Sequence, residues 1–155
     1  MFKKKTSEIK KESKKRNILI AALLVHAAKI DENYTNVEKE IIKKALINLN
    51  LTSSEESETI LKEAEIEEQE SNQIIGFTIE IKKESMEFRL KIIEILWKIV
   101  YSDNANDNYE SNLIRRICGL LYVSDKDNGI IKTKVQNLKN KSWLILWMIN
   151  VLSAN

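Results

Sequence analysis

Apolar residues recur at intervals of three and four along most of the chain, the spacing that places side chains on one face of an α-helix. The pattern predicts helices over residues 18–30, 36–50, 54–68, 71–83, 86–101, 108–122 and 126–138. From Trp143 to Leu152 only Asn150 interrupts a run of apolar residues. A helix this apolar cannot face water on all sides, so we expect it to be buried against the bundle or a second copy of the protein.

The pattern of one stretch occurs twice. An aspartate is followed seven residues later by a glutamate in both places, as Asp31 and Glu38 and as Asp103 and Glu110. The spacing from Asp31 to Asp103 also separates matching apolar positions: Leu24 and Leu96, Ile42 and Ile114, Ala45 and Ile117, and Leu49 and Leu121. We therefore expect an internal pseudo-duplication in which the helices at 18–30, 36–50 and 54–68 superpose on those at 86–101, 108–122 and 126–138.

Composition sets the fold class. The chain has no proline, only three glycines and 31% charged residues, whereas strands and hairpins usually need more turn residues than this. Its 155 residues suit one domain. The prediction is an all-α protein, a compact bundle of seven to eight helices. Residues 1–17 are expected to form a flexible basic arm, 18–138 the helical domain, and 139–155 an apolar C-terminal helix.

Charge is segregated although the formal net charge is only +2. Residues 1–17 are rich in lysine, and eight glutamates lie between Glu55 and Glu70. The glutamate run is typical of a solvated helix face. The lysines have no interleaved aromatic residues on which bases could stack, so no nucleic-acid partner is expected.

Few residues could carry catalysis. The single histidine, His26, lies in a strongly apolar helix, and no cysteine, serine or second histidine stands at a spacing that suggests a partner. The single cysteine, Cys118, falls on an apolar stripe and is expected in the core. No signal-peptide pattern and no apolar run of about 20 residues occurs, which favours a cytoplasmic protein.

With these residues in view, the chain resembles the TerB-like family of small helical bacterial proteins. That family is named for a tellurite-resistance protein and is also found as the N-terminal domain of the co-chaperone DjlA. The resemblance runs from about Ile20 to Val135. The family's marker is an acidic turn, Ala-Asp-Gly followed by five variable residues and a glutamate, once in each half. Here it reads Ile30-Asp31-Glu32 to Glu38 and Ser102-Asp103-Asn104 to Glu110, with no glycine in either turn.

The resemblance implies a helical bundle with a role in a stress or envelope-associated response and acidic turns that bind a divalent cation. The residues themselves allow two interpretations. Thr35 and Asp107 stand three residues before Glu38 and Glu110, as in capping boxes that satisfy free N–H groups at a helix start. Alternatively, the two turns converge, and Asp31, Glu38, Asp103 and Glu110, with Asp107 as a further donor, bind Ca²⁺ or Mg²⁺, which prefer oxygen ligands.

Together these observations favour a non-enzymatic stress-response protein of the tellurite-resistance type that acts through protein partners, among them envelope-associated ones. A homodimer through the C-terminal helix is a further expectation. The alternatives are a metal-dependent enzyme that uses the acidic turn residues and a peripheral membrane adaptor, neither of which is favoured.

Overall fold

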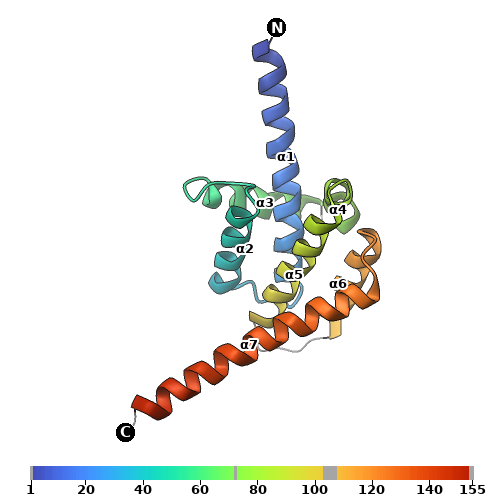
Figure 1. Ribbon diagram of the computed structural model, residues 1–155. Helices are drawn as coiled ribbons and strands as arrows, with labels where there is room; N and C mark the ends of the chain where they lie inside the picture. Colours follow the sequence, from blue (N-terminus) through green and yellow to red (C-terminus); the bar gives the residue numbers. More distant parts are fainter. Residues whose placement is uncertain (1, 72, 103–107, 154–155) are drawn as a thin grey trace.

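The computed structural model describes residues 2–71, 73–102 and 108–153. Within these ranges the chain forms seven helices and no strand, which confirms the predicted all-α class (Figure 1). The helices are α1 (Phe2–Lys29), α2 (Asn36–Asn48), α3 (Ser57–Ser71), α4 (Ile74–Lys82), α5 (Met86–Ser102), α6 (Asn108–Leu120) and α7 (Asp125–Ser153).

The C-terminal half of α1 is the centre of the bundle. Every side chain from Ile20 to Val25 is fully buried, because α2, α3, α4 and α5 all pack against this part of α1. On the other side α5 contacts α2, α4, α6 and α7. Leu24 of α1 and Leu96 of α5, paired by the sequence repeat, are both fully buried. Superposition of the two halves as a whole stays a prediction.

The basic segment differs from the sequence expectation. α1 begins at Phe2 and runs without a break to Lys29, whereas the sequence suggested an irregular arm up to residue 17. Residues 3–15 are exposed, and the helix projects from the bundle (Figure 1). Lysine and glutamate are good helix formers, and a helix already nucleated in the core extends without forming a new nucleus. The expectation of a flexible arm treated residues 1–17 as an isolated segment, whereas they extend a helix that the core already holds.

The C-terminal segment also differs from the expectation. It is not a separate helix but the second half of α7, because no glycine or proline between Leu138 and Ser142 stops the helix. Six of its large apolar side chains are 43–72% exposed, so the bundle does not cover them: Ile145, Trp147, Met148, Ile149, Val151 and Leu152. The prediction that the bundle of the same copy buries them is therefore wrong, and the prediction that a second copy buries them stays open to test. In the described part of the chain, no helix is long and apolar enough to cross a membrane.

Helices α2 and α6 end with the same hydrogen bonds. The N–H of Leu51 donates to the carbonyl of Leu46 over 2.9 Å, and the N–H of Val123 donates to the carbonyl of Cys118 over the same distance. This bond reaches back across the last turn and satisfies a carbonyl that the helix itself leaves free. The two chain segments thus leave their helices in the same way.

Candidate functional site: the acidic turns and a lysine-rimmed groove

The first acidic turn joins α1 to α2 and forms the predicted capping box. The Thr35 hydroxyl oxygen accepts from the N–H of Glu38 over 3.2 Å. A carboxylate oxygen of Glu38 accepts in return from the N–H of Thr35 over 3.0 Å and from its hydroxyl over 3.0 Å. Asp31 accepts from the N–H of Asn33 over 3.0 Å. Glu38 is only 2% exposed, so its carboxylate is held in place at the start of α2.

The second acidic turn is described only in part. Asp103 and Asp107 lie outside the described residues, and Glu110 is buried in the first turn of α6. The α1–α2 connection lies at the same end of the bundle as the end of α5 and the start of α6 (Figure 1). Among the described residues, no three metal-binding side chains of the His, Cys, Asp or Glu type gather. The predicted four-carboxylate site depends on Asp103, so it stays a prediction.

A buried ion-pair cluster joins α1 to α3. One carboxylate oxygen of Glu68 lies 2.7 Å from the Lys29 ammonium, and the other lies 3.1 Å from Nδ1 of His26. Burial alone would raise the pKa of Glu68, but the hydrogen bonds from Lys29 and His26 outweigh it, so the pKa lies below its ordinary value. His26 is therefore held by a structural carboxylate on α3.

The predicted solvated face of the glutamate run is wrong for Glu68. It is only 5% exposed because it continues the buried stripe of α3, which contains Ser57, Ile60, Leu61 and Ala64. A stripe at spacings of three and four includes position 68, so this signal was present in the sequence. Other glutamates of the run also have partners: Glu58 lies 2.9 Å from Lys43, and Glu63 lies 3.5 Å from Lys14.

Cys118 is the predicted core residue. It is 1% exposed on α6, and burial raises the pKa of its thiol to about 12, with the nearby charge of Asp125 adding to the shift. A reactive cysteine needs a lowered pKa, because the thiolate is the nucleophile. The chain's single thiol therefore stays protonated and packed at neutral pH.

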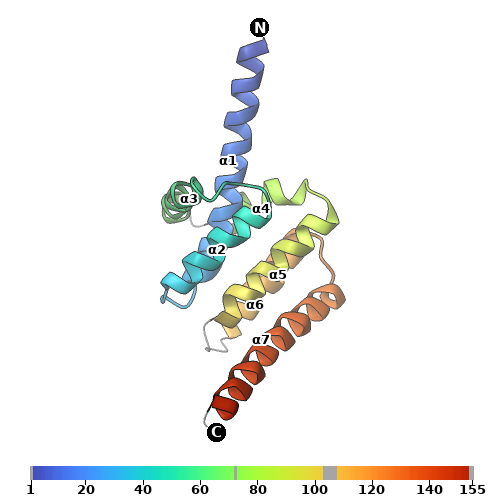
Figure 2. The same cartoon turned by 60° about the vertical axis from the view of Figure 1, so that its left-hand side comes forward.

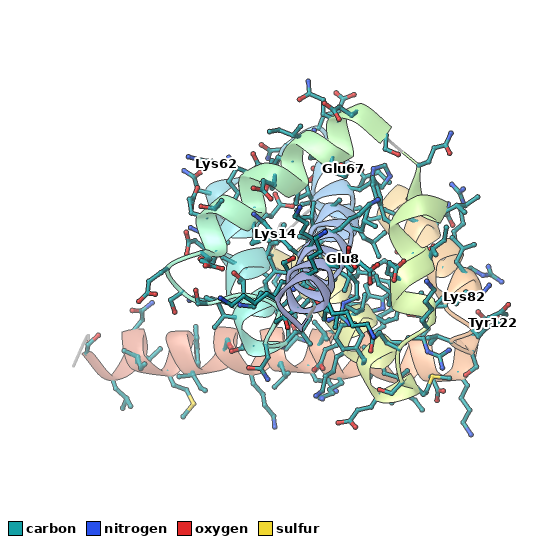
Figure 3. The ribbon with its side chains drawn as sticks, turned by 90° about the horizontal axis from the view of Figure 1, so that it is seen from above. Glu8, Lys14, Lys62, Glu67, Lys82 and Tyr122 are labelled. Carbon is teal, nitrogen blue, oxygen red and sulfur yellow. The ribbon has the colours of Figure 1, made fainter. Side chains whose placement is uncertain are left out.

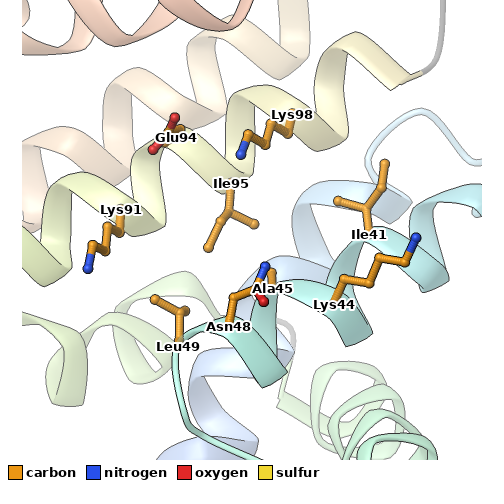
Figure 4. Close-up of a pocket in the computed structure, with 9 residues that line it drawn as sticks. All are labelled: Ile41, Lys44, Ala45, Asn48, Leu49, Lys91, Glu94, Ile95 and Lys98. Carbon is orange, nitrogen blue, oxygen red and sulfur yellow. The ribbon is translucent and has the colours of Figure 1, made fainter. Parts of the chain in front are cut away.

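An open groove with a volume of about 420 Å³ lies between α2 and α5 (Figure 4). Its floor is apolar and its rim is basic. The floor consists of Ile41, Ala45, Leu49 and Ile95, and the rim carries Lys44, Lys91 and Lys98 together with Asn48 and Glu94. We call this the lysine-rimmed groove.

The charges on the rim are unevenly compensated. Glu94 lies 3.1 Å from Lys134 of α7, and Lys91 lies 3.5 Å from Glu87. Within the described residues, no acidic side chain lies at ion-pair distance from Lys44 or Lys98. The groove therefore combines an apolar floor with positive charge that the described part of the protein does not neutralise.

Sequence reasoning missed this groove because its two walls come from helices far apart in the chain. One signal was available. Ala45 of α2 occupies the position that the repeat pairs with Ile117 of α6, so α2 has less side-chain volume at this point. A small residue on an otherwise large apolar stripe leaves space beside the neighbouring helix.

Comparison with known proteins identifies the family. The family described as "Tellurite resistance protein TerB" matches residues 17–133. No curated protein and no solved structure matches the chain. The matched region begins in α1, where the exposed basic part ends, and stops in α7 before its exposed apolar half. It covers most of the chain and includes both acidic turns, so this protein belongs to the TerB family.

Proposed function

We propose that this protein is a non-enzymatic, tellurite-resistance-type stress-response protein that acts by binding a partner protein in its lysine-rimmed groove. The observation that carries the proposal is the pairing of an apolar floor with uncompensated lysines. Ile95 and Ala45 lie at the bottom of the groove, and Lys44 and Lys98 rise beside them from α2 and α5 (Figure 4). Concave apolar surfaces with a few placed charges are typical of binding sites.

The chemistry of the groove defines its partner. An amphipathic helix that docks in a groove buries residues at every third or fourth position and leaves its flanks at the rim. With lysines on both walls, flanking carboxylates on such a helix would meet opposite charge, whereas flanking lysines would be repelled. The proposed partner is therefore a protein that presents an acidic amphipathic helix.

The reactive side chains of the chain support a binding role over an enzymatic one. The only imidazole, His26, is hydrogen-bonded to Glu68, and the only thiol, Cys118, is buried with a raised pKa. A nucleophilic mechanism needs an accessible nucleophile within reach of a base. Neither group is arranged in that way.

A divalent cation is a second part of the proposal. The helices that precede the two acidic turns, α1 and α5, end at the same end of the bundle (Figure 1), and hard carboxylate oxygens favour Ca²⁺ or Mg²⁺. Asp31, at the surface of the first turn, is the proposed ligand there that a cation would reach most easily, because Glu38 is engaged in the capping box. Binding at these turns would leave the groove free for the partner.

The groove is tested with two synthetic peptides that share one apolar helical pattern, one flanked by glutamates and one by lysines. In titrations of isotope-labelled protein, the acidic peptide should shift the amide resonances that line the groove. The Lys44→Glu/Lys98→Glu variant should bind it at least about tenfold more weakly, because two attractions become repulsions. Lys62→Glu, at an exposed lysine of α3, is the matched control and should bind as the wild type does. Equal binding of both peptides, or shifts confined to another face, would contradict the proposal.

A further inference from the structure

One apolar stripe runs along the whole outer part of α7. Its members alternate at spacings of four and three, as in a helix that packs along another helix. They are Ile131, Val135, Leu138, Ser142, Ile145, Ile149 and Leu152. Only Ser142 is polar, and it stands near the middle of the stripe.

The first part of this stripe is already an interface. Val135 is buried and Ile131 packs against the core, because α5 lies against α7 at these positions. A hydrogen bond also joins the two helices: the Trp97 indole N–H donates to the side-chain oxygen of Asn128 over 2.8 Å. The same stripe that holds α7 to the bundle therefore continues into the exposed half of the helix.

α5 covers the apolar stripe of α7 only up to the end of α5 itself. A small hollow of about 240 Å³ marks the place, with Tyr101 and Ser102 of α5 on one side and Leu138 and Ser142 of α7 on the other. Past it, no other helix of the described chain lies beside α7 (Figure 2). The exposed fraction rises from 4% at Val135 to 48% at Leu138, 57% at Ile145 and 72% at Leu152.

A lipid bilayer is a poor occupant for this segment. Residues 143–149 are apolar through nearly two turns, so the segment lacks the polar face that a helix lying in a membrane interface keeps in water. No described helix is long and apolar enough to cross the membrane instead. A helix apolar on all sides and too short to span is normally covered by protein.

We propose that the exposed half of α7 pairs with the same segment of a second copy, with the two helices antiparallel. In each copy α5 ends beside Leu138 and Ser142, so a partner helix has room along the stripe only beyond Ser142. A parallel partner would bring its own α5 into the same space. An antiparallel partner places its bundle at the far end, where no other described helix lies beside α7 (Figures 1 and 2).

When residues 142–152 overlap in antiparallel fashion, Leu152 of one copy lies beside the partner's Ser142, at the hollow where the partner's α5 ends. A twofold axis then passes near Trp147, so each copy contributes the same surface to the contact. The pairing segment lies outside the residues 17–133 that the family matches, and it contains none of the residues that line the lysine-rimmed groove.

Mass measurement tests the pairing. Sedimentation equilibrium of the full chain should give twice the 18.0 kDa of one copy. Ile145→Asp/Ile149→Asp should give the single mass with unchanged helix content, because the bundle does not use these side chains. Ile75→Asp on α4 is the matched control, since Ile75 is 59% exposed and Ile149 56%, and it should remain a dimer. A wild-type protein that is monomeric at a concentration of about 100 μM, or a dimer that survives the double substitution, would overturn the proposal.

Cross-linking tests the orientation. Cys118 is buried, so a single introduced cysteine is the accessible thiol for a short bis-maleimide. Met148→Cys, near the proposed twofold axis, should cross-link to itself, whereas Leu138→Cys should not. Efficient self-cross-linking at both positions would indicate a parallel pair and would refute the antiparallel one. Monomeric protein that co-sediments with phosphatidylglycerol-containing vesicles, and loses this on Ile145→Asp/Ile149→Asp, would show that the segment binds membrane instead.

Discussion

Asn50 and Tyr122 end their helices in the same left-handed backbone conformation, with φ of 58° and 56°. The spacing between them is the one that separates Asp31 from Asp103 in the sequence repeat. Asn50 follows α2 and Tyr122 follows α6, and each directly precedes the residue whose N–H reaches back into its helix. The left-handed residue turns the chain so that this bond can form.

Glycine at position 122 should stabilise the protein relative to alanine. A left-handed backbone costs an L-residue about 1–2 kcal/mol, and glycine pays none of that cost. Tyr122 also lies against Lys82, whose ammonium is 4.6 Å from the ring centroid (Figure 3). Both variants lose this contact, so Tyr122→Gly and Tyr122→Ala differ mainly in backbone strain.

Urea unfolding should give Tyr122→Gly a free energy of unfolding about 1 kcal/mol above that of Tyr122→Ala. The same order is expected for Asn50→Gly and Asn50→Ala. At an ordinary helical position such as Lys62 the order reverses, because glycine destabilises a helix interior. An alanine variant as stable as its glycine partner at position 122 would mean that the left-handed turn is not under strain.

Removing the Glu68 charge should destabilise the contact between α1 and α3. Glu68→Gln keeps the size of the side chain but weakens the interactions with Lys29 and His26. Buried hydrogen bonds to charged groups contribute about 1.5–3 kcal/mol, and a loss in this range is expected. Glu67→Gln on the same helix is the control and should change the stability by less than about 0.5 kcal/mol. Thermal unfolding of the two variants measures the difference.

The contribution of Glu68 should depend on pH. Its pKa in the folded protein is lowered from 4.5, so the unfolded chain takes up a proton first as the pH falls. The stabilisation is therefore complete above about pH 4.5 and is lost as the pH falls through the folded-state pKa. Unfolding curves of the wild type and Glu68→Gln should converge on acidification below that value. A difference in stability that stays constant down to pH 2 would exclude the charged cluster as its source.

Leu24 and Leu96 should respond alike to truncation. Both side chains are fully buried, one in α1 and one in α5, at positions that the repeat pairs. Leu→Ala at a buried site usually costs about 2–5 kcal/mol, depending on how far the cavity collapses. We expect similar losses for Leu24→Ala and Leu96→Ala in urea unfolding. A difference of more than about 2 kcal/mol would indicate that the two halves surround these leucines differently.

The acidic turns can be tested by calorimetry with Ca²⁺ and Mg²⁺. Binding heat is expected for the wild type and should disappear in Asp31→Asn/Asp103→Asn without loss of helix content. Thr35→Ala is a separate control. It should cost about 1 kcal/mol through the lost cap but leave cation binding intact. No heat and no change in melting temperature at millimolar cation would show that the turns are only caps.

Local features of the fold were predictable from the sequence. The Thr35–Glu38 capping box and the burial of Cys118 were both expected and are confirmed. Helical periodicity and capping depend on residues three or four positions apart, so the sequence alone determines them. The class of the fold and most helix boundaries follow from these local interactions.

Tertiary structure decided the rest, because it depends on which surfaces meet. α1 and α7 contain no local stop signal and run on as continuous helices, but only the packed bundle shows that the basic part of α1 and the apolar end of α7 are left uncovered. Glu68 is buried because α1 brings Lys29 and His26 to it, and the lysine-rimmed groove exists because α2 and α5 pack side by side. The amino-acid sequence determined which residues form each helix face, and the long-range packing of the helices determined which of those faces remain open to a partner.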